Sequence, residues 1–273
     1  VAILPNRIQT TNSKKNNMTE TSKIIDNSKP FLRWAGGKRW LIKHIESIKN
    51  LNIKTYYEPF LGGGSVFFNI DNYKKAHLSD LNSELIETYS SIRDNFEDVI
   101  AKLKTFKNTE KEYYKIRETQ FENIIDKSAK FIFLNKTSFN GIYRVNQKGE
   151  FNVPYGFREN IDIIDIANLK NVSLKLQNTT LKCQDFESIS KSIKKGDFVF
   201  LDPPYTVAHE NNGFIQYNQK IFSLEDQIRL SKFIEAIKEK EAYYILTNAK
   251  HKAILEIYNN IDKPIVLKRS STV

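Results

Sequence analysis

Short apolar runs alternate with helical patterns along most of this chain, and this alternation limits the possible folds more than any other feature. The runs that resemble buried strands are Thr55–Tyr57, Ala76–Leu78, Phe198–Leu201, Tyr243–Leu246 and Pro264–Leu267, with Val172–Leu176 as a further candidate. Helical patterns cover Asn82–Asn95, Ser223–Lys240 and Lys250–Tyr258. Such alternation is typical of parallel sheets, so we predict an α/β fold: a doubly wound, mostly parallel sheet with helices on both faces.

The stretch from residue 96 to residue 170 interrupts this rhythm, because it is mostly helical and basic and then becomes polar. An insertion of that length is more than a loop. We therefore predict a second, mainly helical lobe at 96–170, inserted between the two parts of the sheet domain, 31–95 and 171–273. Residues 1–30 are polar and show neither hydrophobic period, so we predict a disordered N-terminal arm.

Charge and cysteine content narrow the class of protein. Lys and Arg number 42 against 32 Asp and Glu, a formal net charge of +10 that suits a polyanionic partner, although a merely solubilising surplus explains it equally well. The single cysteine excludes an intramolecular disulfide framework and a cysteine-rich zinc site. No apolar run is long enough to span a bilayer, and no charged-then-apolar leader opens the chain, so we expect a soluble, cytoplasmic protein.

Three consecutive glycines, Gly62 to Gly64, follow the first predicted strand and precede a helix-like run. Glycines let the backbone turn sharply and let a ligand approach the main chain near a helix N-terminus. A tight turn without any ligand is an equally good explanation of the glycines alone. Asp80 ends the next strand, roughly twenty residues on, where an acidic residue can accept hydrogen bonds from a ribose. The alternative is a helix cap, a role for which Asn82 is the better candidate.

The apolar strand Phe198–Leu201 runs directly into Asp202-Pro203-Pro204-Tyr205. Open α/β sheets bind ligands at the carboxyl ends of their strands, where Asp202 is expected. The two prolines fix φ and remove two N–H donors, which leaves a carboxylate and peptide carbonyls beside the ring of Tyr205. A pocket with only acceptors suits an NH2 group on a flat ring. A simple strand-ending turn is the alternative.

Six segments, in the same order along the chain, resemble motifs of the DNA adenine-N6 methyltransferases of the DNA adenine methylase type. They are 31–38, 58–65, 79–82, 140–144, 149–156 and 202–205. The resemblance covers residues 31–271 and implies a Rossmann-like methyltransferase sheet that binds S-adenosylmethionine. It also implies that the insertion at 96–170 is a target-recognition domain. The family's sheet usually closes with a further strand after a segment like 267–271, whereas this chain ends at Val273.

The resemblance assigns several side chains to the cofactor. Those expected to contact S-adenosylmethionine are Trp34, Lys38, Phe60, Gly62, Gly64, Asp80, Asp185 and Phe186. Trp34 and Lys38 would lie at its methionine end, and Asp80 would hold the ribose hydroxyls. Asp185 and Phe186 would contact its adenine.

The catalytic residues implied are Asp202, Pro203 and Tyr205. Asp202 and the Pro203 carbonyl would accept the two N6–H groups of adenine, and Tyr205 would stack on the base. The adenine must be flipped out of the duplex, because N6 is unreachable inside the stack. The methyl group would pass directly to N6, without a metal ion or a covalent enzyme intermediate.

DNA reading is assigned, again by resemblance, to residues of the first segment and of the inserted lobe. The candidates are Arg33, Asn140, Ile142, Arg144, Pro154 and Tyr155. Arg144 would read a guanine, because its planar fork matches O6 and N7 in the major groove, while Asn140 and Ile142 would wedge into the stack. The expected site is GATC. For each residue the alternative is a phosphate contact, which positions the protein without specifying sequence.

Other activities stay open at this stage. Methylation of cytosine N4 or of RNA adenine is one alternative, although cytosine-N4 enzymes usually carry serine where this chain has Asp202. A catalytically inert DNA-binding module of the same fold is another. The expected partner is double-stranded DNA, with no membrane and a monomeric enzyme, and a cognate restriction endonuclease is a candidate partner.

Overall fold

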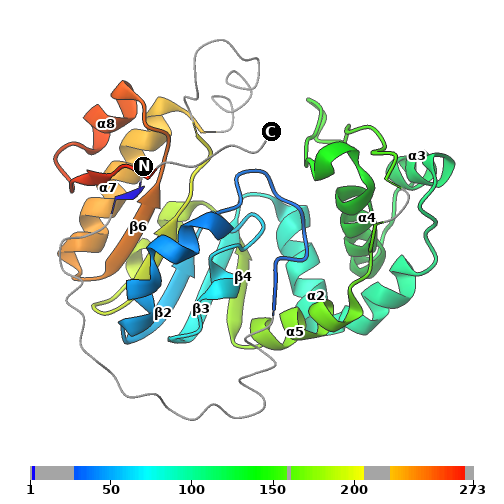
Figure 1. Cartoon of the computed structure of the whole chain (residues 1–273), viewed down its shortest axis with the longest axis horizontal. Helices are drawn as coiled ribbons and strands as arrows, with labels where there is room; N and C mark the ends of the chain where they lie inside the picture. Colours follow the sequence, from blue (N-terminus) through cyan, green and yellow to red (C-terminus); the bar gives the residue numbers. More distant parts are fainter. Residues whose placement is uncertain (1, 4–27, 159–160, 206–221, 268–273) are drawn as a thin grey trace.

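The computed structural model describes residues 2–3, 28–158, 161–205 and 222–267. At its centre lies one sheet with the strand order β4-β3-β2-β5-β6-β1-β7 (Figure 1). The strands are β1 (Ala2–Ile3), β2 (Ile53–Glu58), β3 (Tyr73–Asp80), β4 (Thr179–Cys183), β5 (Phe198–Leu201), β6 (Tyr243–Thr247) and β7 (Pro264–Ile265). Neighbours from β4 to β6 pair in parallel, whereas β1 is antiparallel to both β6 and β7. The predicted α/β class is confirmed.

Helices flank this sheet. The α-helices are α2 (Ser83–Leu103), α3 (Glu110–Glu118), α4 (Ile124–Thr137), α5 (Ile166–Leu176), α7 (Leu224–Glu239) and α8 (Lys252–Tyr258). The 3-10 helices are η1 (Arg39–His44), η2 (Glu46–Asn50), η3 (Phe67–Asn69), η4 (Phe139–Gly141) and η5 (Phe186–Ser192). As predicted, Asn82 caps α2: its Oδ1 accepts the Leu85 N–H at 3.0 Å. None of the helices in the described part of the chain is long and apolar enough to cross a membrane.

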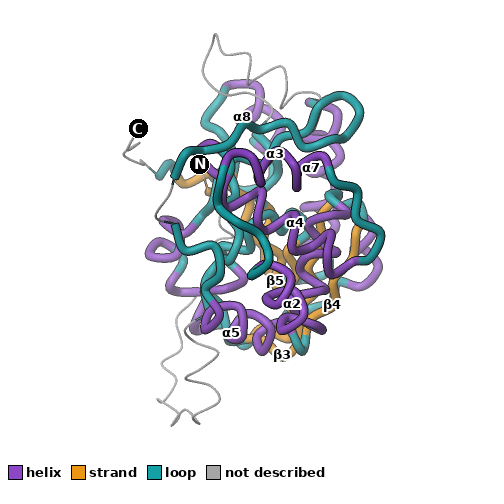
Figure 2. Tube along the Cα trace, turned by 90° about the vertical axis from the view of Figure 1, so that its right-hand side faces the viewer, coloured by secondary structure: helices purple, strands orange, loops and turns teal. Residues whose placement is uncertain are grey.

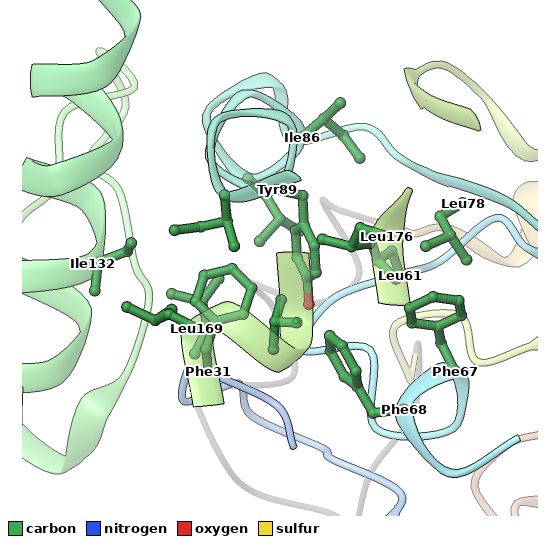
Figure 3. Close-up of a cluster of buried hydrophobic side chains, with 14 of the residues drawn as sticks. Phe31, Leu61, Phe67, Phe68, Leu78, Ile86, Tyr89, Ile132, Leu169 and Leu176 are labelled. Carbon is green, nitrogen blue, oxygen red and sulfur yellow. The ribbon is translucent and has the colours of Figure 1, made fainter. Parts of the chain in front are cut away.

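Each face of the sheet has its own hydrophobic core, because successive strand residues point to opposite faces. On β5, Phe198 and Phe200 pack in a core with α2, α4 and α5, part of which is drawn in Figure 3. Val199 and Leu201 pack in a second core with α7, α8 and η5. Burying one such side chain is worth about 1.5–3 kcal/mol, so both helical layers are held firmly on the sheet.

The direction of strand addition reverses between β2 and β5. The chain proceeds from β2 to β3 and then β4 toward one edge, returns to place β5 beside β2, and continues to β6. Ligands of open α/β sheets bind outside the carboxyl ends of the strands at such a switch point. Glu58 and Asp202 stand at those two strand ends, which makes this edge the place to look for a site.

The helices α3 and α4 form a lobe beside the sheet, at the right of Figure 1, and in Figure 2 they lie in front of the strands. Helix α4 packs mainly on α2, which runs continuously through the predicted boundary at residue 96 with a break in helical geometry at Asn95. The boundary at residue 170 likewise falls inside α5. The predicted domain limits therefore lie within shared helices.

Two predictions about secondary structure were wrong. Val172–Leu176 belongs to helix α5, and the strand lies just after it, at β4. Leu169, Val172 and Leu176 are buried at helical spacing, which a short apolar run alone does not distinguish from a strand. The predicted disorder of residues 1–30 is contradicted where the segment is described, because β1 pairs on both sides with strands and residues 28–30 are placed too; residues 1 and 4–27 lie outside the described part of the chain.

Candidate active site

The glycine turn after β2 requires glycine. Gly62 has a φ of +47° and Gly64 a φ of +64°, both in the left-handed region that other residues rarely adopt. A Cβ on Gly62 would lie 2.7 Å from the Trp34 ring, so the indole covers the turn at van der Waals contact. The glycines therefore let side chains pack directly on the turn at the switch point, since a Cβ on Gly64 would likewise lie 3.0 Å from both Phe68 and Tyr89. A glycine turn at a switch point, with the Asp80 carboxylate beside it, is the arrangement that binds a nucleoside-type ligand such as S-adenosylmethionine in open α/β sheets.

Asp80 braces this turn from the end of β3. Its Oδ2 accepts the Gly62 N–H at 3.0 Å, and its Oδ1 accepts the Asn82 N–H at 3.0 Å. Burial raises the pKa of Asp80, and the hydrogen bonds from these backbone N–H groups oppose that rise. Since each carboxylate oxygen has two lone pairs, Asp80 can hold the turn and still accept from a ligand hydroxyl.

Aromatic rings form a wall beyond the turn. The half-buried Phe60 ring lies 5.4 Å from the Phe186 ring and 5.7 Å from the Phe222 ring, measured between centroids. Asp185 is partnered here, because its Oδ1 accepts from Arg229 Nη2 at 2.9 Å. The guanidinium of Arg229 also lies 4.9 Å from the Phe186 ring centre. The structure therefore places Phe60, Asp185 and Phe186 in one cluster.

The Asp202 carboxylate lies in a notch of polar groups at the end of β5. The Thr247 hydroxyl, at the end of neighbouring β6, donates to Oδ1 at 2.5 Å. Lys38 Nζ lies 2.7 Å from Oδ1 and 2.8 Å from Oδ2. Pro203 is buried and Tyr205 half-buried, with the Tyr205 ring centroid 4.9 Å from the Lys38 ammonium. Lys38 and Asp202 are 164 residues apart in the chain, and the fold brings them into direct contact.

The charge of Lys38 is maintained by its surroundings. Burial alone would lower the pKa of this ammonium, but the adjacent Asp202 carboxylate and Tyr205 raise it more, and the net shift is upward. For the Tyr205 hydroxyl, burial raises the pKa, and the nearby Lys38 ammonium lowers it by a smaller amount, so the net shift is upward. The notch therefore holds an ion pair next to a neutral phenol.

The segment 28–38, here called the strap, is fastened by two buried asparagine side chains. Asn135 Oδ1 accepts the Arg33 N–H at 2.8 Å and Asn135 Nδ2 donates to the Arg33 carbonyl at 2.7 Å. Asn168 makes the same pair of bonds with Lys29, at 2.8 and 3.0 Å. Each asparagine amide thus pairs with the N–H and the carbonyl of one strap residue, as the backbone of a neighbouring β-strand would. These bonds hold the strap to the ends of α4 and α5.

The strap joins the glycine turn to the segment 139–144. The Trp34 ring, which covers Gly62, also stacks on Tyr143 with centroids 5.2 Å apart. Arg33 packs so closely over Gly141 that a Cβ there would lie 2.3 Å from its Cδ. The strap, with residues predicted to contact the cofactor, is therefore in direct contact with the segment 139–144, whose residues were predicted to read DNA.

The predicted DNA-reading residues differ in exposure. Asn140, Arg144 and Pro154 are exposed and Ile142 is half-buried. Arg144 is oriented by Asn152, whose side-chain oxygen accepts from Nε at 2.8 Å and whose carbonyl accepts from Nη2 at 3.3 Å.

Tyr155, unlike Asn140, Arg144 and Pro154, is buried. It is only 5% exposed, and its hydroxyl donates to Asn108 Oδ1 at 2.9 Å, so its ring packs inside the lobe. Phe157, two residues later, is 67% exposed and has a φ of +49°. Burial thus differs between Pro154 and Tyr155, the two residues of this region that were predicted together to contact DNA.

Three residues at the site were not identified from the sequence: Thr247, Asn135 and Asn152. Thr247 reaches Asp202 only because β6 lies next to β5, with Leu246 paired to Leu201. The strand order was needed to see this. The sequence does contain a signal for Asn135, because this polar residue directly follows the apolar run Phe131–Leu134. In the structure Asn135 is fully buried. A buried amide needs partners, and here the strap supplies them.

Comparison with known proteins agrees with this geometry. Residues 34–272 match the family described as D12 class N6 adenine-specific DNA methyltransferase. The chain is 40% identical to the Type II methyltransferase M.MjaIII of Methanocaldococcus jannaschii over 81% of its length and 84% of that protein. It is 36% identical to the Type II methyltransferase M1.LlaDCHI of Lactococcus lactis, over 90% and 89% of the two chains.

The DNA adenine methylase of Escherichia coli K12 is 29% identical, over 89% of each chain. The family match spans far more than half of the chain, and it includes the strap from Trp34, the glycine turn and the Asp202 notch. The resemblance expected from the six motifs is confirmed. The protein belongs to the D12 class of N6-adenine-specific DNA methyltransferases.

Proposed function

We propose that this DNA adenine methyltransferase flips adenine out of duplex DNA at GATC sites and transfers a methyl group directly from S-adenosylmethionine to N6. The single observation that carries the proposal is the Asp202 notch. A carboxylate fixed by Thr247 and followed by two prolines stands at the switch point, beside the glycine turn. Adenine N6 and the methyl group of S-adenosylmethionine would meet at that edge of the sheet.

The chemistry needs a better nucleophile than adenine offers, because the N6 lone pair is delocalised into the ring. When bound, S-adenosylmethionine supplies an electrophilic methyl group. Asp202 and the Pro203 carbonyl accept the two N6–H groups, which favours a pyramidal nitrogen with an available lone pair. Tyr205 stacks on the base and orients it. Positioning and preorganised acceptors are the main sources of acceleration in such a site.

The cofactor residues proposed lie around the glycine turn and in the aromatic cluster beyond it. The turn at Gly62 and Gly64 would lie along the cofactor, and Asp80 has lone pairs left for ribose hydroxyls. The half-buried Phe60 ring, stacked on the buried Phe186, offers a flat face suited to adenine. Trp34 and Lys38 would face the methionine end, and Asp185 the cofactor's adenine.

DNA contacts are proposed for the exposed side of the inserted lobe. The lysines of 96–170 suit phosphates, while Arg33, Asn140, Ile142, Arg144 and Pro154 lie where the strap meets the lobe or on the lobe itself. The relatives named Type II methyltransferases support a role beside a cognate restriction endonuclease, and a monomer acting on double-stranded DNA is sufficient for this chemistry.

The target sequence is tested by incubating DNA with the enzyme and S-adenosylmethionine and then digesting it with methylation-sensitive endonucleases. We expect protection at GATC sites and cleavage at sites that differ by one base. Protection of DNA that lacks GATC would overturn the assignment of the site.

Replacing Arg144 with alanine should relax one position of the recognition sequence at a cost of about 1–3 kcal/mol, since a bidentate contact to guanine would be lost. Methylation rates on duplexes with single-base changes measure this. Lys148→Ala, at an exposed lysine four residues after Arg144, is the matched control and should weaken binding to all sequences alike. If Arg144→Ala also lowers every rate equally, Arg144 contacts only the backbone.

A further inference from the structure

We propose that Lys38 is a positioning residue that holds the place of the target amine in the DNA-free enzyme and gives it up when adenine enters. The inference rests on the proposed role of Asp202 as acceptor for N6–H. It concerns what that carboxylate does before the base arrives.

The surroundings of the Lys38 ammonium are those expected for the target amine. Its Nζ donates to Asp202 and, at 2.6 Å, to the carbonyl of Gly36, and it lies over the Tyr205 ring. The Lys38 side chain is only 6% exposed, so this is an ordered, desolvated contact. A nitrogen that only donates, bound to the carboxylate beside an aromatic ring, is the arrangement required of adenine N6.

Lys38 and adenine compete for one acceptor group. Thr247 already donates to Oδ1 of Asp202, and Lys38 approaches both oxygens within 2.8 Å. An ammonium bound so closely neutralises the carboxylate and weakens it as an acceptor for a neutral amine. Full acceptor strength toward N6–H therefore requires Lys38 to move away from Asp202.

The Lys38 side chain is suited to such a displacement, whereas its backbone is held by the Lys38 carbonyl, which accepts the Leu41 N–H at 2.8 Å. A lysine has a flexible four-carbon stem and three donors on a compact head group, so it can leave one acceptor without backbone movement. In the DNA-free enzyme the contact has a separate benefit, because leaving a partly buried carboxylate unpaired is costly. Lys38 thus keeps Asp202 paired and oriented until the amine takes its place.

The test compares the affinity of the enzyme for two duplexes that differ only at the target base, adenine in one and purine, which lacks the amine, in the other. Lys38→Met should raise the adenine-to-purine affinity ratio by roughly tenfold, because the amine then binds a carboxylate without a competing ammonium. Fluorescence anisotropy at pH 8 measures both affinities. Lys43→Met, an exposed lysine of η1, is the matched control and should leave the ratio unchanged.

The opposite result would overturn the inference. If Lys38 were a permanent support for Asp202, the ratio would fall toward one in Lys38→Met; an unchanged ratio contradicts the inference as well. Lys38→Gln, which keeps most of the stem and one neutral donor, provides a second variant if the methionine variant does not fold, and it should give a smaller rise. These failures are distinguishable from failure of the proposed function, in which the unmodified enzyme transfers no methyl group to adenine N6.

Discussion

Asp202→Ala is expected to lower the rate of methyl transfer by roughly a hundredfold to a thousandfold, the loss typical of removing one preorganised group from a reacting centre. The variant loses the acceptor for N6–H and also the ionic partner of Lys38. The glycine turn and its brace Asp80 lie on other strands, so affinity for S-adenosylmethionine should change little. Single-turnover transfer of a labelled methyl group measures the rate, and titration calorimetry measures cofactor affinity.

Asp71→Ala is the matched control for this substitution, because Asp71 is an exposed aspartate in the loop before β3. It should leave both the rate and the cofactor affinity near the values of the unmodified enzyme. Near-normal turnover in Asp202→Ala would remove the carboxylate from the mechanism. Equal loss of cofactor binding and of turnover would make Asp202 part of the cofactor site instead.

Glu58→Gln should abolish most of the dependence of stability on pH between about 5 and 8. Burial raises the pKa of Glu58 from its ordinary value of 4.5 to about 8; the hydrogen bond from Tyr56, 2.6 Å long, opposes the rise, and the charge of Asp202 adds to it. A carboxyl with a raised pKa in the folded state stabilises the protein fully below its unfolded pKa. That stability is lost as pH rises through the folded value, by about 1.4 kcal/mol per pH unit at most.

Glutamine keeps an oxygen that can accept from Tyr56 and from the Phe67 N–H, without a charge to desolvate. Denaturant unfolding at several pH values between 5 and 8.5 gives the free energy of unfolding. The unmodified enzyme should lose stability across this range while Glu58→Gln loses much less. Glu46→Gln, an exposed glutamate, should behave like the unmodified enzyme. Parallel pH profiles for Glu58→Gln and the unmodified enzyme would show that Glu58 is not the titrating group.

The parts of the site that follow directly from strand ends could be predicted from the sequence. Asp202 and the glycine turn each adjoin an apolar strand in the chain, so local pattern placed them at the carboxyl edge of the sheet. Their neighbours across the sheet could not be found this way. Thr247 reaches Asp202 through the pairing of β5 with β6, and Lys38 reaches it across 164 residues.

Which side chains face the interior could not be predicted from the sequence either. Tyr155 directly follows the exposed Pro154, yet it is buried, and its hydroxyl donates to Asn108, a residue 47 positions earlier in the chain. Val172–Leu176 likewise became helix because its apolar residues meet α2 and the sheet at helical spacing. Both outcomes were decided by tertiary contacts, which override local preference in short segments.

The most direct test of the central claim is the identity of the methylated nucleoside. Duplex DNA is incubated with the enzyme and S-adenosylmethionine, digested to nucleosides and analysed by mass spectrometry, with Asp202→Ala in parallel. The Asp202 notch predicts N6-methyladenine as the product, formed by the unmodified enzyme and nearly absent with the variant. N4-methylcytosine as the main product, or no methylated nucleoside from an enzyme that binds S-adenosylmethionine, would contradict it.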